Sequence, residues 1–423
     1  MQPPKTPKSR RATETKACRG AIYCVPTQMS ISSNVRRERN TEFGVFGGHQ
    51  KNQEIQQGGK MRVKIVTMAA ASMLLLLVFS ACQQHETETA ITSGKKTQAS
   101  YSRAELEGFV DKYMDAMLAK KVDPALFAKN VRFTENGVQL PLGDEGLWSS
   151  MVGKGTYKFY VPDVEINQIA FIGTAREESN TDRNGDPVAV ALRLKIENGR
   201  ISEAEQLVIR ADSGMGGGNL PPAAVSIESG GEPHPIFFTA IPEADRPSRD
   251  DLIVVANKYF TGMQKNDGNG DYPFTDDCHR LENGTATTNT PLRPGQTAPD
   301  PKTTTNYSTA WGCREQFESG LLYFVTRIRD RRYVAVDREN GNVFAFGFFD
   351  HAAGKTRHFT TPDGRSVSSG PIAPWTWQIA EIFRIENNKI RRVEAVLQKV
   401  PYGMNSGWST FEKGWSDEIQ IVK

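Results

Sequence analysis

Two stretches of the chain, residues 102–117 and 248–263, carry apolar side chains at helical spacing, for example Leu106, Phe109 and Tyr113 in the first. Each stretch begins with a serine that is followed three residues later by an acidic residue, a pattern typical of a capped helix N-terminus. Ser, Arg, Leu, Lys, Tyr and Met coincide between the two stretches. The pattern predicts two repeats, each opening with an amphipathic helix.

Alternating apolar and polar residues follow each predicted helix and indicate strands. Residues 194–201 and 383–390 are two such runs, interrupted by Asn-Gly and Asn-Asn respectively. These dipeptides favour two-residue hairpin turns. Residues 132–137 also match 280–284, with one residue of slip. Each repeat therefore combines one predicted helix with a predicted hairpin of strands.

Changes in composition divide the chain. Residues 211–247 are rich in Gly and Pro, which indicates a linker. The expected organisation is an extension at 1–60, a signal segment at 61–81, a tether at 82–101, domains at 102–210 and 248–408 flanking the linker at 211–247, and a tail at 409–423.

The signal segment has two cations, Arg62 and Lys64, followed by the largely apolar run 65–80 and then Cys82. A charged start, an apolar core and small residues at the end are the layout of a secretory signal peptide. The apolar run is shorter than the ~20 residues of a membrane span. A cysteine after the small residues resembles the lipobox of bacterial lipoproteins. That resemblance implies lipidation of Cys82 and a membrane-anchored protein of the cell envelope, facing the periplasm or exterior.

Residues 1–60 precede this signal, and we expect them to be either a disordered basic arm or a product of a misplaced start codon before Met61. They and the signal carry net charges of +7 and +2, so the remainder of the +3 chain is near −6. An acidic remainder gives no electrostatic case for a nucleic-acid partner.

Two cysteines, Cys278 and Cys313, follow the predicted anchor. Outside the cytoplasm such a pair is expected to form a disulfide. Two buried thiols or a metal site are the alternatives left open, although the spacing around Cys278 fits no standard zinc motif.

Two further motifs, at 277–284 and at 401–408, read Asp-Cys-His-Arg-Leu-Glu-Asn-Gly and Pro-Tyr-Gly-Met-Asn-Ser-Gly-Trp. Together with the repeats, they resemble an uncharacterised group with two nuclear transport factor 2-like (SnoaL-like) domains. The resemblance implies an α+β fold class, with cone-shaped domains that each have a helix on a curved, mainly antiparallel sheet and an apolar pocket between helix and sheet. Members of that superfamily include isomerases, dehydratases, cyclases and inert modules, so the fold alone does not choose an activity.

The strongest candidate chemistry lies in the second repeat, where the run 343–351 alternates as a strand and ends in Asp350-His351. Asp350 would lie at the end of a phenylalanine-lined face, where desolvation raises a carboxyl pKa and favours acid–base catalysis. His351 would point to the opposite face unless the strand bulges. The alternative is that Asp350 only caps the turn that ends this strand.

Three further residues are candidates. Strand alternation would put Arg327, Arg329 and Arg331 on one face and Arg332 on the other. Arg331 or Arg332 would stabilise an anion, and His351 or Tyr402 would be the proton partner of Asp350. A solvated strand face and a core tyrosine are the alternatives. Glu205 and Glu394, present in both repeats, are expected to have structural roles.

These observations lead to two hypotheses. The first is a lipid-anchored protein that binds a small apolar molecule and, if it is an enzyme, performs isomerisation, dehydration or cyclisation without a cofactor or metal. The second is a non-catalytic binding module whose apolar face is filled by a partner or by the other repeat.

Overall fold

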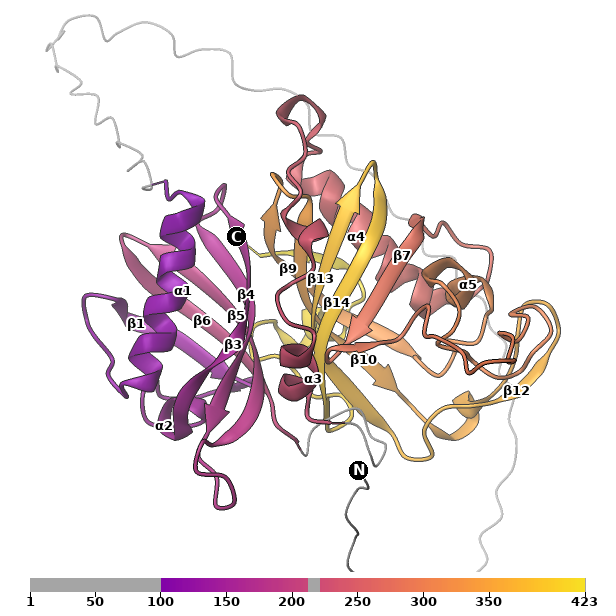
Figure 1. Cartoon of the computed structure of the whole chain (residues 1–423), viewed down its shortest axis with the longest axis horizontal. Coiled ribbons are helices and arrows are strands. Elements are labelled where there is room, and N and C mark those ends of the chain that lie inside the picture. Colours follow the sequence, from indigo (N-terminus) through magenta and orange to yellow (C-terminus); the bar gives the residue numbers. More distant parts are fainter. Residues whose placement is uncertain (1–99, 212–220, 423) are drawn as a thin grey trace, which may run out of the picture. The chain divides into compact units, whose positions relative to one another are not determined.

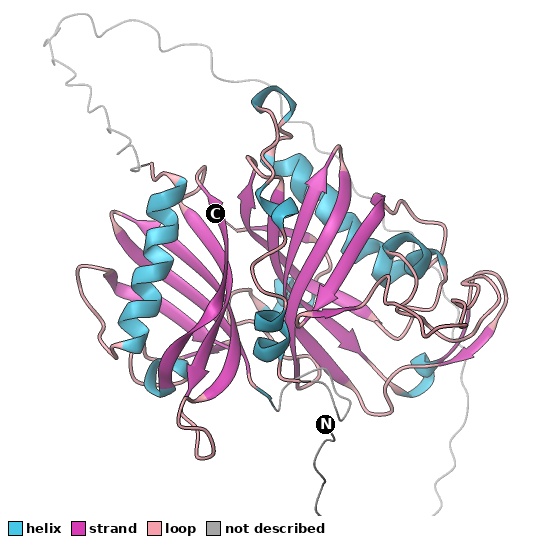
Figure 2. Cartoon of the chain, in the orientation of Figure 1, coloured by secondary structure: helices cyan, strands magenta, loops and turns pink. Residues whose placement is uncertain are grey.

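The computed structural model describes residues 100–211 and 221–422. These residues form an α+β fold in which two mainly antiparallel sheets each carry a long helix (Figure 1). Strands predominate over helices in both halves (Figure 2). The expected signal segment and Cys82 lie outside the described residues.

The first half contains one long helix, one short helix and six strands. They are α1 (Arg103–Leu118), β1 (Phe127–Glu135), β2 (Val138–Gln139), α2 (Leu147–Ser150), β3 (Met151–Asp163), β4 (Gln168–Glu177), β5 (Asp186–Glu197) and β6 (Arg200–Ile209).

The second half follows a connecting segment with α3 (Ala223–Ser229) and two single 3-10 turns, η2 (Pro235–Phe238) and η3 (Glu243–Asp245). It contains α4 (Arg249–Lys265), β7 (Phe274–Glu282), β8 (Thr285–Ala286), α5 (Cys313–Glu318), β9 (Arg327–Asp337), β10 (Asn342–His351), η4 (Gly354–Arg357), β11 (His358–Thr360), β12 (Ser366–Ser368), β13 (Trp375–Glu386), β14 (Lys389–Val400), α6 (Phe411–Trp415) and β15 (Ile419–Ile421).

The two sheets have the same strand order. The first runs β2-β1-β6-β5-β4-β3, and the second runs β8-β7-β14-β13-β10-β9 with β15 added beside β9. Because β15 pairs in parallel with β9, the expected C-terminal tail contributes a strand to the second sheet. Both long helices begin at the predicted serines, Ser102 and Ser248, whose side chains accept a backbone hydrogen bond. This confirms the helix starts.

The hairpin turns also follow the sequence pattern. Asn198 and Gly199, and likewise Asn387 and Asn388, have positive φ values, as primed turns require. Both residue types adopt this left-handed region more readily than others do. The predicted β5–β6 and β13–β14 hairpins are therefore confirmed.

A matching asparagine stabilises each parallel strand pair. The Asn136 side chain donates to the carbonyl of Val208 at 3.2 Å and accepts from its N–H at 2.7 Å. Asn283 makes the same two bonds to Leu397, at 3.0 and 2.9 Å. Each side chain thereby holds the end of a strand beside its parallel neighbour, β1 beside β6 and β7 beside β14.

Three apolar clusters fill this architecture. One lies between α1 and the first sheet and another between α4 and the second sheet. The third joins the opposite faces of the two sheets, and includes Ile172, Phe159, Phe344 and Phe346. The phenylalanine face of β10 therefore packs against the other half of the chain, and it does not line a pocket beneath α4.

Candidate functional site

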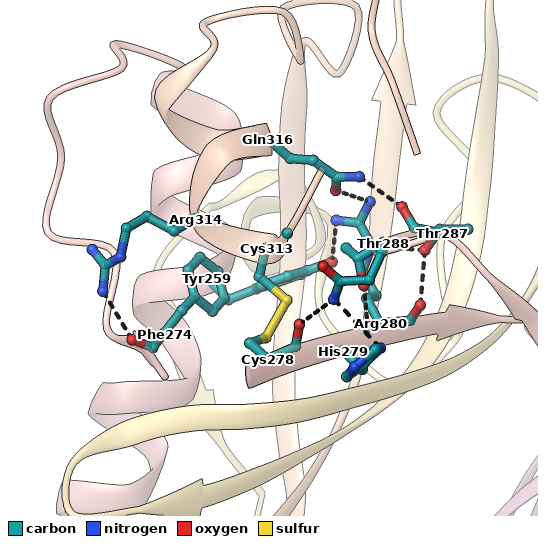
Figure 3. The surroundings of a disulfide bond; sticks show 12 residues. Tyr259, Phe274, Cys278, His279, Arg280, Thr287, Thr288, Cys313, Arg314 and Gln316 are labelled. Atoms are coloured by element: carbon teal, nitrogen blue, oxygen red, sulfur yellow. Dashed lines mark hydrogen bonds between the residues drawn. A yellow bond between two sulfur atoms is a disulfide. The ribbon is translucent and has the colours of Figure 1, made fainter. Parts of the chain in front are cut away.

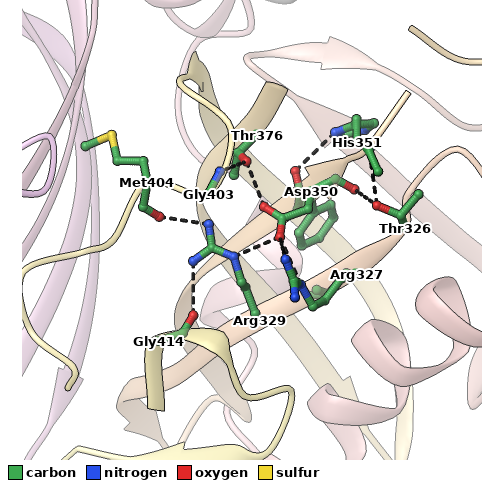
Figure 4. Close-up of polar contacts among 12 residues, drawn as sticks. Thr326, Arg327, Arg329, Asp350, His351, Thr376, Gly403, Met404 and Gly414 are labelled. Carbon is green, nitrogen blue, oxygen red and sulfur yellow. Dashed lines mark hydrogen bonds and ion pairs between the residues drawn. The ribbon is translucent and has the colours of Figure 1, made fainter. Parts of the chain in front are cut away.

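Asp350 lies at the end of β10 with no exposed surface and with both carboxylate oxygens engaged (Figure 4). Its Oδ2 accepts hydrogen bonds from Arg327 at 2.7 and 3.0 Å and from Arg329 at 2.9 Å. Its Oδ1 accepts from Thr376 at 2.7 Å. A carboxylate whose two oxygens are both engaged, one of them by two arginines, presents no free oxygen to a substrate. The expected role of Asp350 as a catalytic base is not supported, and we assign it a structural role.

This ion cluster also anchors the segment after β14. Arg329 donates to the carbonyl of Met404 at 2.8 Å, and the backbone N–H of Gly403 donates to Thr376 at 3.1 Å. The neighbouring Tyr402 side chain is 41% exposed and makes no hydrogen bond within the described residues. Tyr402 is therefore not placed as the proton partner of a buried site.

His351 lies on the opposite face of β10 from Asp350, as the alternation predicted. Its ring stacks on Trp375 with centroids 3.9 Å apart, and its Nδ1 is 3.1 Å from the carbonyl of Phe349. Burial lowers the pKa of His351 to about 4, so the ring is neutral at physiological pH. It does not act on the same side of the sheet as Asp350.

A bulge in β9 changes which of the two candidate arginines shares a face with Arg329. Asp330 has φ +51°, and the β9–β10 register shifts opposite Gly347. Arg331 therefore points to α4, where it donates to Thr261 at 3.0 Å. Arg332 joins Arg329 on the other face, so the simple alternation expected for these arginines is wrong there. Asp350, His351, Arg331, Arg332 and Tyr402 do not form one site.

A different polar cluster lies inside the second half, between α4 and the sheet (Figure 3). At its centre is Arg280 of β7, which is 4% exposed. Its guanidinium donates to Tyr307 and Gln316 at 2.8 Å, to Thr287 at 2.9 Å and to Tyr259 at 3.3 Å. Its hydrogen-bond partners are neutral, and its positive charge is paired with the Glu282 carboxylate, 3.3 Å from its Nε.

Glu381 of β13 is the acid of this cluster. It is 2% exposed, it interacts with Tyr259 by a hydrogen bond, and its Oε2 has no partner within the described residues. Burial, reinforced by the negative charge of Glu282, raises the pKa of Glu381 to about 8. A buried carboxyl with this pKa and an unpaired oxygen is an acid–base group suited to neutral pH.

The first half lacks this pair of charges. When the equivalent strands are matched through their pairings, Arg280 takes the place of Phe133, and Glu381 takes the place of Leu192. Both apolar residues belong to the first half's core. The sequence alone did not suggest Glu381. Extending the match between residues 194–201 and 383–390 by two positions toward the N-terminus would have aligned Glu381 with Leu192.

The disulfide brings the remaining partners to Arg280. Cys278 of β7 and Cys313, the first residue of α5, are bonded with their Cα atoms 5.8 Å apart (Figure 3). This confirms the predicted pairing. Because α5 carries Gln316, the bond holds that amide beside Arg280.

The two recurrent glutamates point between the sheets. Glu205 is bonded to Arg332 of the second sheet, while Glu394 accepts from Arg392 at 2.6 Å and from Tyr157 of the first sheet at 3.3 Å. These contacts confirm the structural role expected for both residues.

Within residues 100–211 and 221–422, no helix is long and apolar enough to span a membrane. In the same part of the chain, no three His, Cys, Asp or Glu side chains gather as metal ligands.

A family model described as a domain of unknown function (DUF8021) matches residues 245–397. This range contains both α4 and the Arg280–Glu381 cluster. The chain matches no curated protein.

Three solved structures are similar over part of the chain. AclR, a putative hydroxylase from Streptomyces galilaeus, is 11% identical, with 36% of this chain and 83% of that chain covered and a TM-score of 0.22. A protein of unknown function with a cystatin-like fold from Methylobium petroleophilum PM1 is 19% identical, with 29% and 87% covered and a TM-score of 0.20. A de novo designed protein with a curved β-sheet is 14% identical, with 36% and 88% covered and a TM-score of 0.20.

Proposed function

We propose that the second half of the chain binds a small, largely apolar carbonyl compound and moves a proton beside the carbonyl, with Glu381 as the acid–base group. The observation that carries this proposal is the buried Glu381 carboxyl with an unpaired oxygen, set beside Arg280 where the first half has only apolar residues. A buried ionisable pair of this kind is retained at a stability cost, which favours a functional role.

Each residue of the cluster has its own role in the proposed reaction. Ionised Glu381 takes a proton from the carbon next to the carbonyl, and the apolar surroundings keep it a strong base. The Arg280 cation and the Tyr259 hydroxyl stabilise the negative charge that develops on the carbonyl oxygen. Return of the proton to another carbon completes an isomerisation. Transfer of the same proton from Glu381 to a β-hydroxyl, which leaves as water while the carbon–carbon double bond forms, completes a dehydration. Neither reaction requires a cofactor.

Access to this cluster is expected from the side of Glu282 and Tyr307. The Glu282 side chain is 20% exposed, lies 3.3 Å from Arg280 and so links the interior to the surface. Tyr307 is also only partly buried. A ligand entering there would reach Arg280 first and Glu381 behind it.

The cellular setting is part of the same proposal. The lipobox-like segment ending at Cys82 and the disulfide support a lipid-anchored protein that faces the periplasm or exterior. The equivalent strand order of the two sheets supports two nuclear transport factor 2-like, SnoaL-like domains.

A non-catalytic binding module is the second candidate. It is favoured by Phe344 and Phe346, because the apolar face that they form is filled by the first sheet and is not open to a ligand. Under that proposal the first half and the second serve only to stabilise each other.

The test is turnover of pooled lipophilic ketones, enones and hydroxy-carbonyl compounds by the full chain, followed by mass spectrometry and chromatography. The wild type is compared with Glu381→Gln, which keeps the shape, and with Glu386→Gln as a control. We expect a new product or isomer with wild type and control, and none with Glu381→Gln. No conversion by folded protein, or conversion that survives Glu381→Gln, would favour the binding module.

A further inference from the structure

A cavity of about 230 Å³ lies between the two sheets, on the opposite face of β7 and β14 from the Glu381 cluster. Its walls come from β3 and β4 of the first half, from α3 and the connecting segment, and from β7 and β14. Ile172, Ile227 and Val396 give it apolar surface. A concave, mainly apolar space with a few convergent polar groups is the usual form of a small-molecule site.

Two hydrogen-bond donors at this cavity lack partners. Arg392 uses Nε for Glu394, at 2.6 Å, while its two terminal nitrogens make no hydrogen bond within the described residues. His234 accepts a backbone hydrogen bond from Ile236 on Nδ1 at 3.2 Å, which places the proton of the neutral ring on Nε2. Partial desolvation, together with the positive charge of Arg392, lowers the pKa of His234, which favours that neutral form.

Both carboxylate oxygens of Glu394 at the cavity are already engaged. Glu394 receives Arg392 on one oxygen and the Tyr157 hydroxyl, at 3.3 Å, on the other. The Arg392–Glu394 pair makes the polar wall neutral overall, and Glu232 at the rim adds a negative charge. A ligand is thus offered donors without a net positive charge, which suits a carbonyl oxygen better than a carboxylate.

We infer that this cavity is a second binding site, distinct from the Glu381 cluster, for a small neutral molecule with an apolar body and a carbonyl oxygen. The apolar body packs on Ile172 and Val396, and the carbonyl accepts hydrogen bonds from Arg392 and His234. Because the walls come from both halves, the ligand also stabilises their association.

The experiment compares three compounds that share one ring: cyclohexanone, cyclohexanecarboxylate and cyclohexylamine. Each is titrated into the full chain, and saturation-transfer NMR gives its dissociation constant. We expect cyclohexanone to bind most tightly, since the carboxylate meets Glu394 and Glu232 and the amine meets Arg392 without offering an acceptor. Tighter binding of the carboxylate or the amine, or no binding of cyclohexanone, would overturn the inference.

Matched variants locate the site. Arg392→Met should weaken cyclohexanone binding by about tenfold or more, the usual effect of losing a hydrogen bond to a charged group. The neighbouring Arg391→Met, whose arginine pairs with Asp277 outside the cavity, should leave it unchanged. Equal affinity in both variants would contradict the assignment.

Two more substitutions keep the test decisive if Arg392→Met does not fold. His234 is exposed, so His234→Phe should fold and still weaken cyclohexanone binding, whereas His358→Phe, at another exposed histidine, should not. Glu381→Gln should leave unchanged the part of the cyclohexanone affinity that Arg392→Met and His234→Phe remove, because Glu381 does not line this cavity. Loss of binding in Glu381→Gln alone would place the ligand in the Glu381 cluster and reject the second site, without affecting the proposed function.

Discussion

Glu205 of the first sheet and Arg332 of the second form a two-pronged ion pair, with N···O distances of 2.6 and 2.7 Å. Both side chains are at most 5% exposed. The pair crosses the apolar layer between the sheets. Arg332 also lies 3.3 Å from a second carboxylate, that of Asp330. The Glu205–Arg332 pair therefore specifies how the two sheets are aligned, because any displacement separates two desolvated charges.

We expect Glu205→Ala to destabilise the protein by about 3–5 kcal/mol, the usual effect of leaving one partner of a buried pair unpaired. The measurement is the free energy of unfolding in urea. The control is Glu165→Ala, which removes another ion pair between the halves, Glu165–Arg338, whose side chains are 43% and 38% exposed. The control should change the free energy of unfolding by less than about 1 kcal/mol. Equal effects of both substitutions would contradict this view of the interface.

The Glu381 carboxyl predicts an unusual dependence of stability on pH. Its pKa is raised from 4.5 to about 8 in the folded protein. Between these values the folded state keeps the proton that the unfolded state releases, so rising pH favours unfolding. Relative to Glu381→Gln, the wild type should lose on the order of 4–5 kcal/mol from pH 4.5 to 8 and little more above it.

Glu386 should give stability the opposite dependence on pH, and Glu386→Gln tests this. Burial would raise the pKa of Glu386, but hydrogen bonds from Arg384 and Arg391 lower it. Its contribution to stability is therefore present above pH 4.5 and is lost as the pH falls. Glu386→Gln should be less stable than the wild type at pH 7, with a difference that shrinks in acid. Thermal melts across this range distinguish the two behaviours, and a pH-independent effect of Glu381→Gln would rule out the raised pKa.

Asp350→Asn should act on stability and not on turnover. The substitution leaves Arg329, which has no exposed surface, without its carboxylate. We expect a loss of about 3–5 kcal/mol in urea unfolding. Any activity found for the wild type should persist in the fraction that stays folded. Unchanged stability together with lost turnover would restore Asp350 as the catalytic base.

The disulfide should contribute strongly to the second half. It closes a loop with a sequence separation of 35, for which chain entropy gives about 3–4 kcal/mol. Reduction, or the double substitution Cys278→Ala with Cys313→Ala, should lower the midpoint of unfolding accordingly. It should also loosen Gln316 from Arg280, which hydrogen exchange of α5 would detect. Full protection of α5 after reduction would show that packing alone holds it.

The sequence predicted the parts of the fold that local chemistry decides. Ser102 and Ser248 mark the helix starts, and Asn198 and Asn387 mark hairpin turns, because each acts on its own backbone neighbours. The bulge at Asp330 was not predictable in this way. It depends on partners far along the chain, such as the Ser416 carbonyl that accepts from its N–H at 2.9 Å. Because of the one extra residue in the bulge, Arg332 and not Arg331 shares a face with Arg329, the reverse of what simple alternation predicted.

The candidate site was misplaced for a related reason. Alternation correctly put Asp350 on the phenylalanine face of β10, but it does not indicate what covers that face. The first sheet covers it, so the carboxylate became part of an interface and not of a pocket. Glu381, like Asp350, is an acidic residue in a largely apolar strand. The two differ in what covers them, because Glu381 faces α4 and Asp350 faces away from it.

The paired bonds of Asn283 to Leu397 have a consequence for β7 as a whole. Along this strand Arg280 and Leu281 face opposite sides of the sheet. A slip of one residue would turn Leu281 inward and carry the guanidinium into the cavity between the sheets. By fixing the register of β7, the Asn283 amide determines that Arg280, and not Leu281, faces the interior beneath α4. Asn136 fixes the register of β1 in the same way, so that Phe133 faces the core of the first half.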